Sequence, residues 1–323
     1  MIKIEKYVFS GSLTNEMYDL LVNSKHFEPL DVLVSQIDRG SIKKMIQWKQ
    51  EGFVRWLFID SGAFSVHTGK AHTTTDEYIE YLNSIDESFD VCAQLDTIPG
   101  KFGQHKKPED YVESANKSWE NFLYMRQRLK SPNKVMPVFH FGEDVKYLGR
   151  MLDWKDENGN QLEYIGLSPA NDAPKEDRMI YLRDMYEYIK HSSNPNVKTH
   201  VYGFTSLDAM SKFPCYSADS ITHRLLAGYA KIISRNFGVV SISLKVRNTK
   251  AKSSMSIVDA ADDFNLDIFK QELADLGFTL EQVQNSVSAR VVVNILNIQY
   301  LSKTKYKYKE TNLAKPKKLF SIM

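Results

Sequence analysis

Short runs of β-branched and aromatic residues alternate along much of the chain with longer stretches that have one polar face. Such runs are typical of buried parallel strands, and such stretches are typical of the helices that cover them. The pattern predicts strands at Asp31–Gln36, Arg55–Ile59, Phe89–Leu95, Lys134–Phe139, Tyr164–Leu167, Thr199–Tyr202, Cys215–Ala218 and Val239–Leu244. It predicts helices at Thr75–Ile85, Pro108–Leu129, Asp144–Leu152, Lys175–His191, Ser206–Lys212 and Thr222–Ser234.

Regular alternation of strand and helix gives a parallel sheet, because each crossover returns the chain in the same direction. About eight repeats favour an α/β fold of the (β/α)₈ TIM-barrel type over an open sheet. No glycine-rich dinucleotide motif or Walker loop follows a strand. The expected organisation is a barrel over residues 1–245 and an extension over residues 246–323. The extension reads as helical, apart from the β-branched run Val291–Val293, and ends in a basic tail.

Composition describes a globular chain, with 42% hydrophobic and 25% charged residues among 323. No apolar run is long enough to span a bilayer, and the first residues lack the layout of a secretory signal. The two cysteines, Cys92 and Cys215, are too few for a disulfide framework or a multi-cysteine zinc site. We therefore expect a cytoplasmic protein (in the host cytoplasm if phage-encoded) with no membrane partner, no metal and no cofactor.

Charge is unevenly distributed along the chain, although the formal net charge is only +2. Residues 303–318 contain seven lysines and one glutamate, interleaved with Tyr306 and Tyr308, and Tyr300 comes just before them. A basic tail on a mildly acidic body fits a polyanionic partner. A solvated terminal tail explains the same charges equally well.

Polar and small residues gather at the ends of the predicted strands. They are Asp60, Ser61, Gly62 and Phe64 in FIDSGAF, Asp96 in AQLD, His140 in PVFH, Gly166 and Leu167 in YIGLSP, Tyr202 and Gly203 in HVYGF, and Asp219 in CYSAD. In a (β/α)₈ barrel these strand ends face one rim, where such folds carry their active sites. A single aspartate after a strand is usually a cap or turn residue. Three at three strand ends predict a site.

This set of residues suits cleavage of a bond between a sugar and a base. Positive charge develops at the anomeric carbon and a carboxylate can capture it, while the leaving base needs a proton donor. Asp60 and Asp219 can divide these tasks if their surroundings separate their pKa values. Phe64 and Tyr202 could stack on a flat base, although core packing is an equally good reading of each.

The motifs FIDSGAF, QLDTIPG, YIGLSP, HVYGF and CYSADS, in this order, resemble those of the tRNA-guanine transglycosylase superfamily. The resemblance covers roughly residues 31–245. It implies a (β/α)₈ barrel that exchanges an encoded guanine for a free 7-deazaguanine without breaking the backbone. Members of this superfamily often form homodimers, so a second copy of the chain is a candidate partner.

The resemblance implies a role for each matching residue. Asp219 would be the nucleophile that forms a covalent glycosyl–enzyme intermediate, and Asp60 would be the general acid/base. The remaining positions would bind the base: Phe64 and Tyr202 by stacking, Asp96 at its amidine-like edge, Gly166 and Leu167 through backbone groups, Gly203 by keeping the pocket open, Ser61 and Gly62 as neighbours of Asp60, and His140 in place of the usual glutamine.

Departures from the family pattern bear on the polymer that is modified. Members that act on tRNA carry a zinc site of three cysteines and one histidine after the barrel, whereas this chain has neither residue type from residue 245 onward. The chain is therefore closer to the phage and bacterial DNA 7-deazaguanine transglycosylases, which insert a preQ0-type base. The expected partners are DNA and the free base, with tRNA as the alternative polymer.

Two readings of other kinds remain open. A nucleoside or sugar hydrolase would use the same carboxylate pair with water, and spacing alone does not separate it from a transglycosylase. A catalytically silent nucleic-acid-binding barrel would use the basic tail, although the presence of both Asp60 and Asp219 argues against it.

Overall fold

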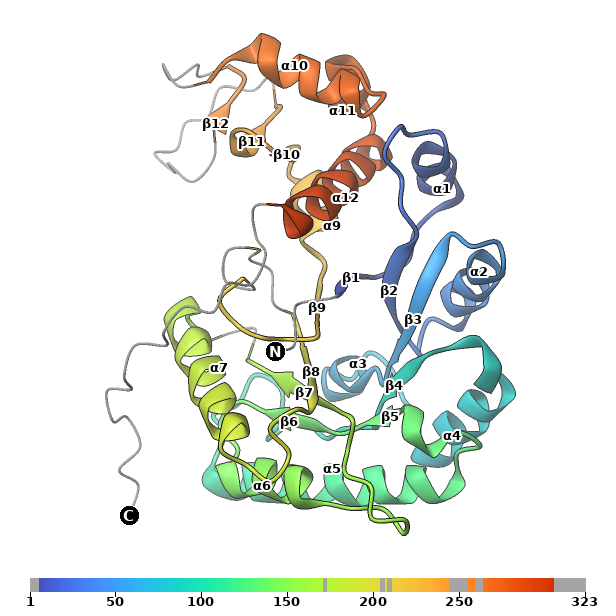
Figure 1. Ribbon diagram of the computed structural model, residues 1–323, viewed down its shortest axis with the longest axis vertical. Helices are drawn as coiled ribbons and strands as arrows, with labels where there is room; N and C mark the ends of the chain where they lie inside the picture. Colours follow the sequence, from blue (N-terminus) through green and yellow to red (C-terminus); the bar gives the residue numbers. More distant parts are fainter. Residues whose placement is uncertain are drawn as a thin grey trace.

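The computed structural model describes residues 6–170, 173–203, 207, 211–243, 255–258 and 264–304. Its main sheet is a ring of parallel strands surrounded by helices (Figure 1). The strands are β1 (Lys6–Ser10), β2 (Leu30–Ser35), β3 (Val54–Asp60), β4 (Val91–Ala93), β5 (Val135–Met136), β6 (Val138–His140), β7 (Tyr164–Ser168), β8 (Lys198–Val201) and β9 (Ser217–Ser220). Their order around the ring is β5-β4-β3-β2-β1-β9-β8-β7-β6.

Pro137 is the residue at which the ring closes. It separates β5, which pairs with β4, from β6, which pairs with β7. Proline has no N–H to donate, but the Pro137 carbonyl accepts a hydrogen bond from the Gly166 amide at 2.7 Å. Strands β5 and β6 therefore act as one strand with a break, and the sheet is a (β/α)₈-type barrel, as the sequence predicts.

One predicted barrel strand belongs elsewhere, and one barrel strand was not predicted. The run Val239–Leu244 contains β11 (Gly238–Ser241), which pairs antiparallel with β10 (Lys231–Ser234) and parallel with β12 (Met255–Ser256) in a separate sheet. Its barrel position is taken by β1, which pairs with both β2 and β9. The predicted helix Thr222–Ser234 was also too long, because α9 (Thr222–Gly228) gives way to β10.

Helices pack on the outside of the barrel strands (Figure 1). Around the barrel these are α1 (Asn15–Val22), α2 (Arg39–Gln50), α3 (Ala63–His67), α4 (Thr75–Ser84), α5 (Pro108–Arg128), α6 (Val145–Asp153), α7 (Lys175–Lys190) and α9. Helical character after residue 260 is confirmed by α10 (Leu266–Asp275), α11 (Leu280–Asn285) and α12 (Val287–Lys303), and the run Val291–Val293 lies in α12. The predicted helix Ser206–Lys212 falls largely outside the described residues.

Alternation along the strands separates two cores. Side chains that face into the barrel form one cluster: Val8, Leu33, Trp56, Phe58, Val91, Ala93, Met136 and Val138, with Tyr164 and Tyr202 against them. Intervening residues such as Phe9, Leu57, Cys92 and Leu167 belong to the larger core under the helices. Because side chains alternate with a period of two, Asp60, Tyr202 and Asp219 fall on the inward face. None of the helices in the described part of the chain has both the length and the apolar character needed to cross a membrane.

Candidate active site

Polar side chains occupy the carboxyl-terminal mouth of the barrel. Four of them are the last or the last but one residue of a strand: Ser10 on β1, Asp60 on β3, His140 on β6 and Asp219 on β9. Because all eight barrel positions run parallel, these ends meet at one rim. The rim thus brings together residues that are far apart in the sequence.

Asp219 is held from two sides by donors of different kinds. Its Oδ2 accepts a short hydrogen bond from the Ser10 hydroxyl, and its Oδ1 accepts one from the Gly203 backbone amide at 2.8 Å. Gly203 adopts φ +59°, a left-handed conformation that glycine reaches readily. Donors to a carboxylate stabilise its charged form. Ser10 was missed from the sequence because β1 was not recognised as a barrel strand.

A buried polar chain leads from Asp219 into the barrel. His200 Nε2 lies 3.3 Å from Asp219 Oδ1, and His200 Nδ1 lies 2.6 Å from the Ser217 hydroxyl, which in turn contacts the Tyr164 hydroxyl. The Nε2 atom is buried and has no hydrogen-bond partner among the described residues. Neither His200 nor Ser217 was assigned a role from the sequence.

Asp60 has a different environment. Its Oδ2 accepts one hydrogen bond, at 3.0 Å, from the Gly62 amide. Burial and the negative charges of Asp96 and Asp219 together raise the pKa of Asp60 to about 7, against the opposing effect of the Gly62 and Ser61 amides. A group with this pKa exchanges protons readily near neutral pH.

Gly62 allows the turn that presents Asp60. Its φ is +74°, and a Cβ there would lie 2.5 Å from Ile37 Cγ1 and 2.9 Å from Ser35 Oγ. The chain turns at this residue from β3 into the short helix α3. A side chain would therefore disturb the turn for both conformational and steric reasons.

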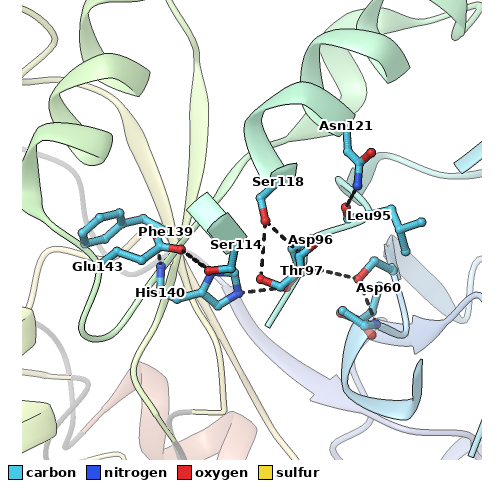
Figure 2. A network of polar contacts seen from close by, with 12 residues as sticks. Asp60, Leu95, Asp96, Thr97, Ser114, Ser118, Asn121, Phe139, His140 and Glu143 are labelled. Carbon is cyan, nitrogen blue, oxygen red and sulfur yellow. Dashed lines mark hydrogen bonds and ion pairs between the residues drawn. The ribbon is translucent and has the colours of Figure 1, made fainter. Parts of the chain in front are cut away.

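Asp96 is enclosed by two donors. The Ser61 hydroxyl donates to Oδ1 at 2.7 Å, and His140 Nε2 faces Oδ2 at 2.9 Å. Figure 2 shows Asp96 between His140 and the strand end that carries Asp60. The structure thus joins Ser61, Asp96 and His140, which the sequence placed at three separate strand ends.

The loop that carries Asp96 is fastened to helix α5. The Thr97 amide donates to Ser118 Oγ at 2.8 Å, and Asn121 Nδ2 donates to the Leu95 carbonyl at 2.7 Å (Figure 2). These bonds hold the backbone on either side of Asp96. Hydrogen bonds to α5 therefore hold the segment that carries the Asp96 carboxylate.

His140 has a second carboxylate on its other side. Its Nδ1 lies 3.2 Å from Glu143 Oε1, and its backbone amide donates to Glu143 Oε2 at 3.1 Å. Burial lowers the pKa of His140, but the bonds to Asp96 and Glu143 outweigh it and raise the pKa to about 10. Glu143 was not singled out from the sequence, although its place three residues after His140 in HFGE is a signal that could have found it.

Tyr202 lies over Gly166 inside the barrel. A Cβ on Gly166 would lie 2.8 Å from Tyr202 Cε2 and 3.2 Å from Met136 Cε, so the ring needs the space that glycine leaves. The Tyr202 hydroxyl is enclosed and has no hydrogen-bond partner among the described residues. Burial raises the pKa of Tyr202, and the charges of Asp60, Asp96 and Asp219 add to the increase.

Two predicted base-binding residues stand apart from this cluster. Phe64 is 61% exposed on α3 and contacts Phe102 edge-on, with ring centroids 6.5 Å apart. Leu167 directs its side chain into the outer core, and its carbonyl accepts a hydrogen bond from the Tyr202 amide. Stacking by Phe64 and backbone contacts by Leu167 remain predictions.

The basic tail lies mostly outside the described residues, as do Tyr306 and Tyr308. Tyr300, at the end of α12, is partly exposed with the Arg235 guanidinium over its ring, and Lys303 forms an ion pair with Glu28. In the described part of the chain, no group of three or more His, Cys, Asp or Glu side chains is arranged to hold a metal ion.

Fold and site define a (β/α)₈-type barrel with a cluster of carboxylates and histidines at the rim formed by the carboxyl ends of its strands. No protein-family model and no curated protein matches the chain.

Proposed function

We propose that this protein is a transglycosylase that exchanges guanine in DNA for a free 7-deazaguanine of the preQ0 type. The observation that carries the proposal is the contrast between two aspartates at one rim. Asp219 accepts hydrogen bonds from Ser10 and Gly203, whereas Asp60 accepts one and has its pKa raised to about 7. Carboxylates in different environments can divide nucleophilic and acid–base roles.

In the proposed first step, Asp219 attacks the anomeric carbon of the guanine nucleotide. The bond from that carbon to guanine N9 breaks, and protonated Asp60 gives its proton to the departing base. The sugar is then bound to Asp219 as an ester. In the second step, ionised Asp60 takes the N9 proton from the incoming 7-deazaguanine, whose nitrogen displaces Asp219 and restores the carboxylate.

The base would lie in the mouth of the barrel, with Asp96 at its N–H edge. Tyr202 supports this location, because its enclosed hydroxyl lacks a partner among the described residues and its ring lies inside the barrel over Gly166. A buried polar group without a hydrogen-bond partner costs about 1–3 kcal/mol, and a bound ligand that supplies the partner can offset this cost. His140 is less suited to bind the base directly, since both of its ring nitrogens face carboxylates.

DNA is the proposed polymer because of two sequence features. The chain has no cysteine or histidine after residue 245 from which to build the zinc site of the tRNA-acting relatives, and its lysine-rich tail suits phosphate contacts. A guanine in duplex DNA would have to leave the helix to reach the rim, at a cost of a few kcal/mol.

The test is base exchange with a defined polymer. The protein is incubated with duplex DNA, or separately with tRNA, and with free preQ0, and each polymer is then digested to nucleosides for mass analysis. Modified deoxynucleoside is the expected product. Modified ribonucleoside alone would show that tRNA is the substrate, and release of guanine without insertion of preQ0 would identify a hydrolase.

A further inference from the structure

Asp96, His140 and Glu143 form a line of ionisable groups that runs from the rim into the protein (Figure 2). His140 Nε2 faces Asp96 at 2.9 Å and Nδ1 faces Glu143 at 3.2 Å. The side chains keep only 11%, 8% and 1% of their surface, in the order Asp96, His140, Glu143. Water therefore has little access to any contact in the line.

The proton positions in this line follow from its chemistry. An ionised carboxylate can only accept hydrogen bonds, so a ring nitrogen that faces one must carry a proton. Both nitrogens of His140 face carboxylates, so the ring is the charged imidazolium when both carboxylates are ionised. The raised pKa of His140, about 10, is consistent with this state at neutral pH.

Glu143 is the anchor of the line. One of its oxygens faces the His140 ring, and the other accepts from the His140 backbone amide at 3.1 Å. It is therefore tied to the same residue twice, and the ring cannot rotate without breaking a contact with a charged group. The imidazolium in turn fixes one oxygen of Asp96, while Ser61 fixes the other.

We propose that Glu143 and His140 are positioning residues that hold Asp96 as a charged, fixed acceptor, and that this makes the rim select bases with two adjacent N–H donors. The proposal rests on the proposed function, because it takes Asp96 to be the group that meets the base. A 2-amino-4-oxo edge, as in guanine and 7-deazaguanine, offers such a pair of donors. A base without the amino group offers Asp96 one donor instead of two, and a site built to pair with a donor binds an analogue that lacks it much more weakly.

Equilibrium binding of free bases, with no polymer present, tests the selection. Affinities are measured for 7-deazaguanine and for its analogue that lacks the 2-amino group. The wild-type protein is expected to prefer 7-deazaguanine by at least about 100-fold. The Glu143→Gln variant is expected to bind 7-deazaguanine about 10- to 100-fold more weakly, since a hydrogen bond to a charged group is lost, and to discriminate less.

The chain supplies a matched control. Glu187 faces His191 Nε2 at 2.9 Å on the exposed end of α7, so Glu187→Gln breaks a glutamate–histidine pair far less buried than the first. This variant should keep both affinities. Thermal melting of each variant separates loss of binding from loss of fold.

Nitrogen-15 NMR of the His140 ring tests the charge state in the wild-type protein. The ring should keep both protons at pH 8, and loss of either below that pH would overturn the inference. If the protein exchanges bases but Glu143→Gln binds and discriminates like wild type, the inference fails and the proposed function stands. If the protein discriminates between free bases but exchanges none, the proposed function fails and the inference stands. If it binds neither base, both fail.

Discussion

The Gly203 backbone amide donates a hydrogen bond to Asp219 Oδ1 across 2.8 Å, from the loop after β8 to the end of β9. A second donor, the Ser10 hydroxyl, comes from a strand 209 residues earlier in the chain. The carboxylate is therefore oriented by backbone and side chain from two neighbouring strands. In the proposed reaction this orientation aims an oxygen of Asp219 at the sugar.

Asp219→Asn should abolish base exchange and leave no covalent adduct with DNA. The amide keeps the size of the side chain but is a poor nucleophile, and it offers a donor where Ser10 and Gly203 require acceptors. Adduct formation is measured by a denaturing gel shift. Asp31→Asn is the control, because Asp31 is also buried in the barrel but pairs with Arg55 near the start of β2. That variant should lose stability and keep exchange. Persistent exchange by Asp219→Asn would disprove the nucleophile.

The rate of adduct formation should fall as pH rises through about 7, because only protonated Asp60 can donate to the leaving base. Well above this value the rate should drop about tenfold per pH unit in single-turnover experiments. Asp60→Asn should remove both the activity and this dependence. A rate that stays constant from pH 6 to 9 would assign the proton to another group.

Stability should also depend on Asp60. Because the folded-state pKa, about 7, lies above the ordinary 3.8, the native state binds this proton more tightly than the unfolded state. The contribution of Asp60 to the free energy of unfolding therefore decreases as pH rises from about 4 to 7 and is constant above. Asp60→Asn should be more stable than wild type at pH 8, by chemical denaturation, and closer to it at pH 4.

Asp96→Asn should lower the pKa of Asp60. After burial, the charge of Asp96 is the largest cause of the increase at Asp60, so its removal favours ionised Asp60. In the pH profile of adduct formation, the decline should then begin at lower pH than in wild type. Affinity for the free base should fall as well. An unchanged profile would show that the two carboxylates do not interact.

Ser217→Ala should slow exchange by up to about tenfold without changing the KM of the free base. It removes the hydrogen-bond partner of His200 Nδ1, so the ring that lies 3.3 Å from Asp219 loses a contact that orients it. It also leaves the buried Tyr164 hydroxyl without its Ser217 contact. Adding Tyr164→Phe should therefore recover part of the lost stability but not the lost rate. Recovery of both the stability and the rate would show that the contacts among His200, Ser217 and Tyr164 have a purely structural role.

Gly166→Ala should weaken base binding and lower stability by about 1–3 kcal/mol, the usual cost of overpacking. The new methyl would lie 2.8 Å from Tyr202 Cε2 and would displace the ring. Gly228→Ala is the matched control, since no atom lies within 4 Å of a Cβ there. Equal effects of the two substitutions on base affinity would show that Tyr202 does not contribute to base binding.

Much of the barrel could be predicted because its signal is local. Buried parallel strands are short apolar runs between amphipathic helices, and seven of the predicted runs overlap barrel strands. The eighth, Val239–Leu244, was wrong as a barrel strand because a β-branched run does not state which sheet it joins. Strand β1 was missed because the run KYVFS is short, and only its pairing with β2 and β9 shows that it is a barrel strand.

The sequence by itself determined which residues stand at the strand ends, because parallel strands and their period of two place Asp60, His140 and Asp219 on one rim. Only the tertiary structure decided what surrounds each of them. Ser10 reaches Asp219 because β1 pairs with β9, and the contacts of His140 with Glu143 and Asp96 make it a partner of Asp96 rather than a candidate base contact. Charge and proton affinity depend on burial and on neighbours distant in the chain, and spacing along the sequence does not encode these.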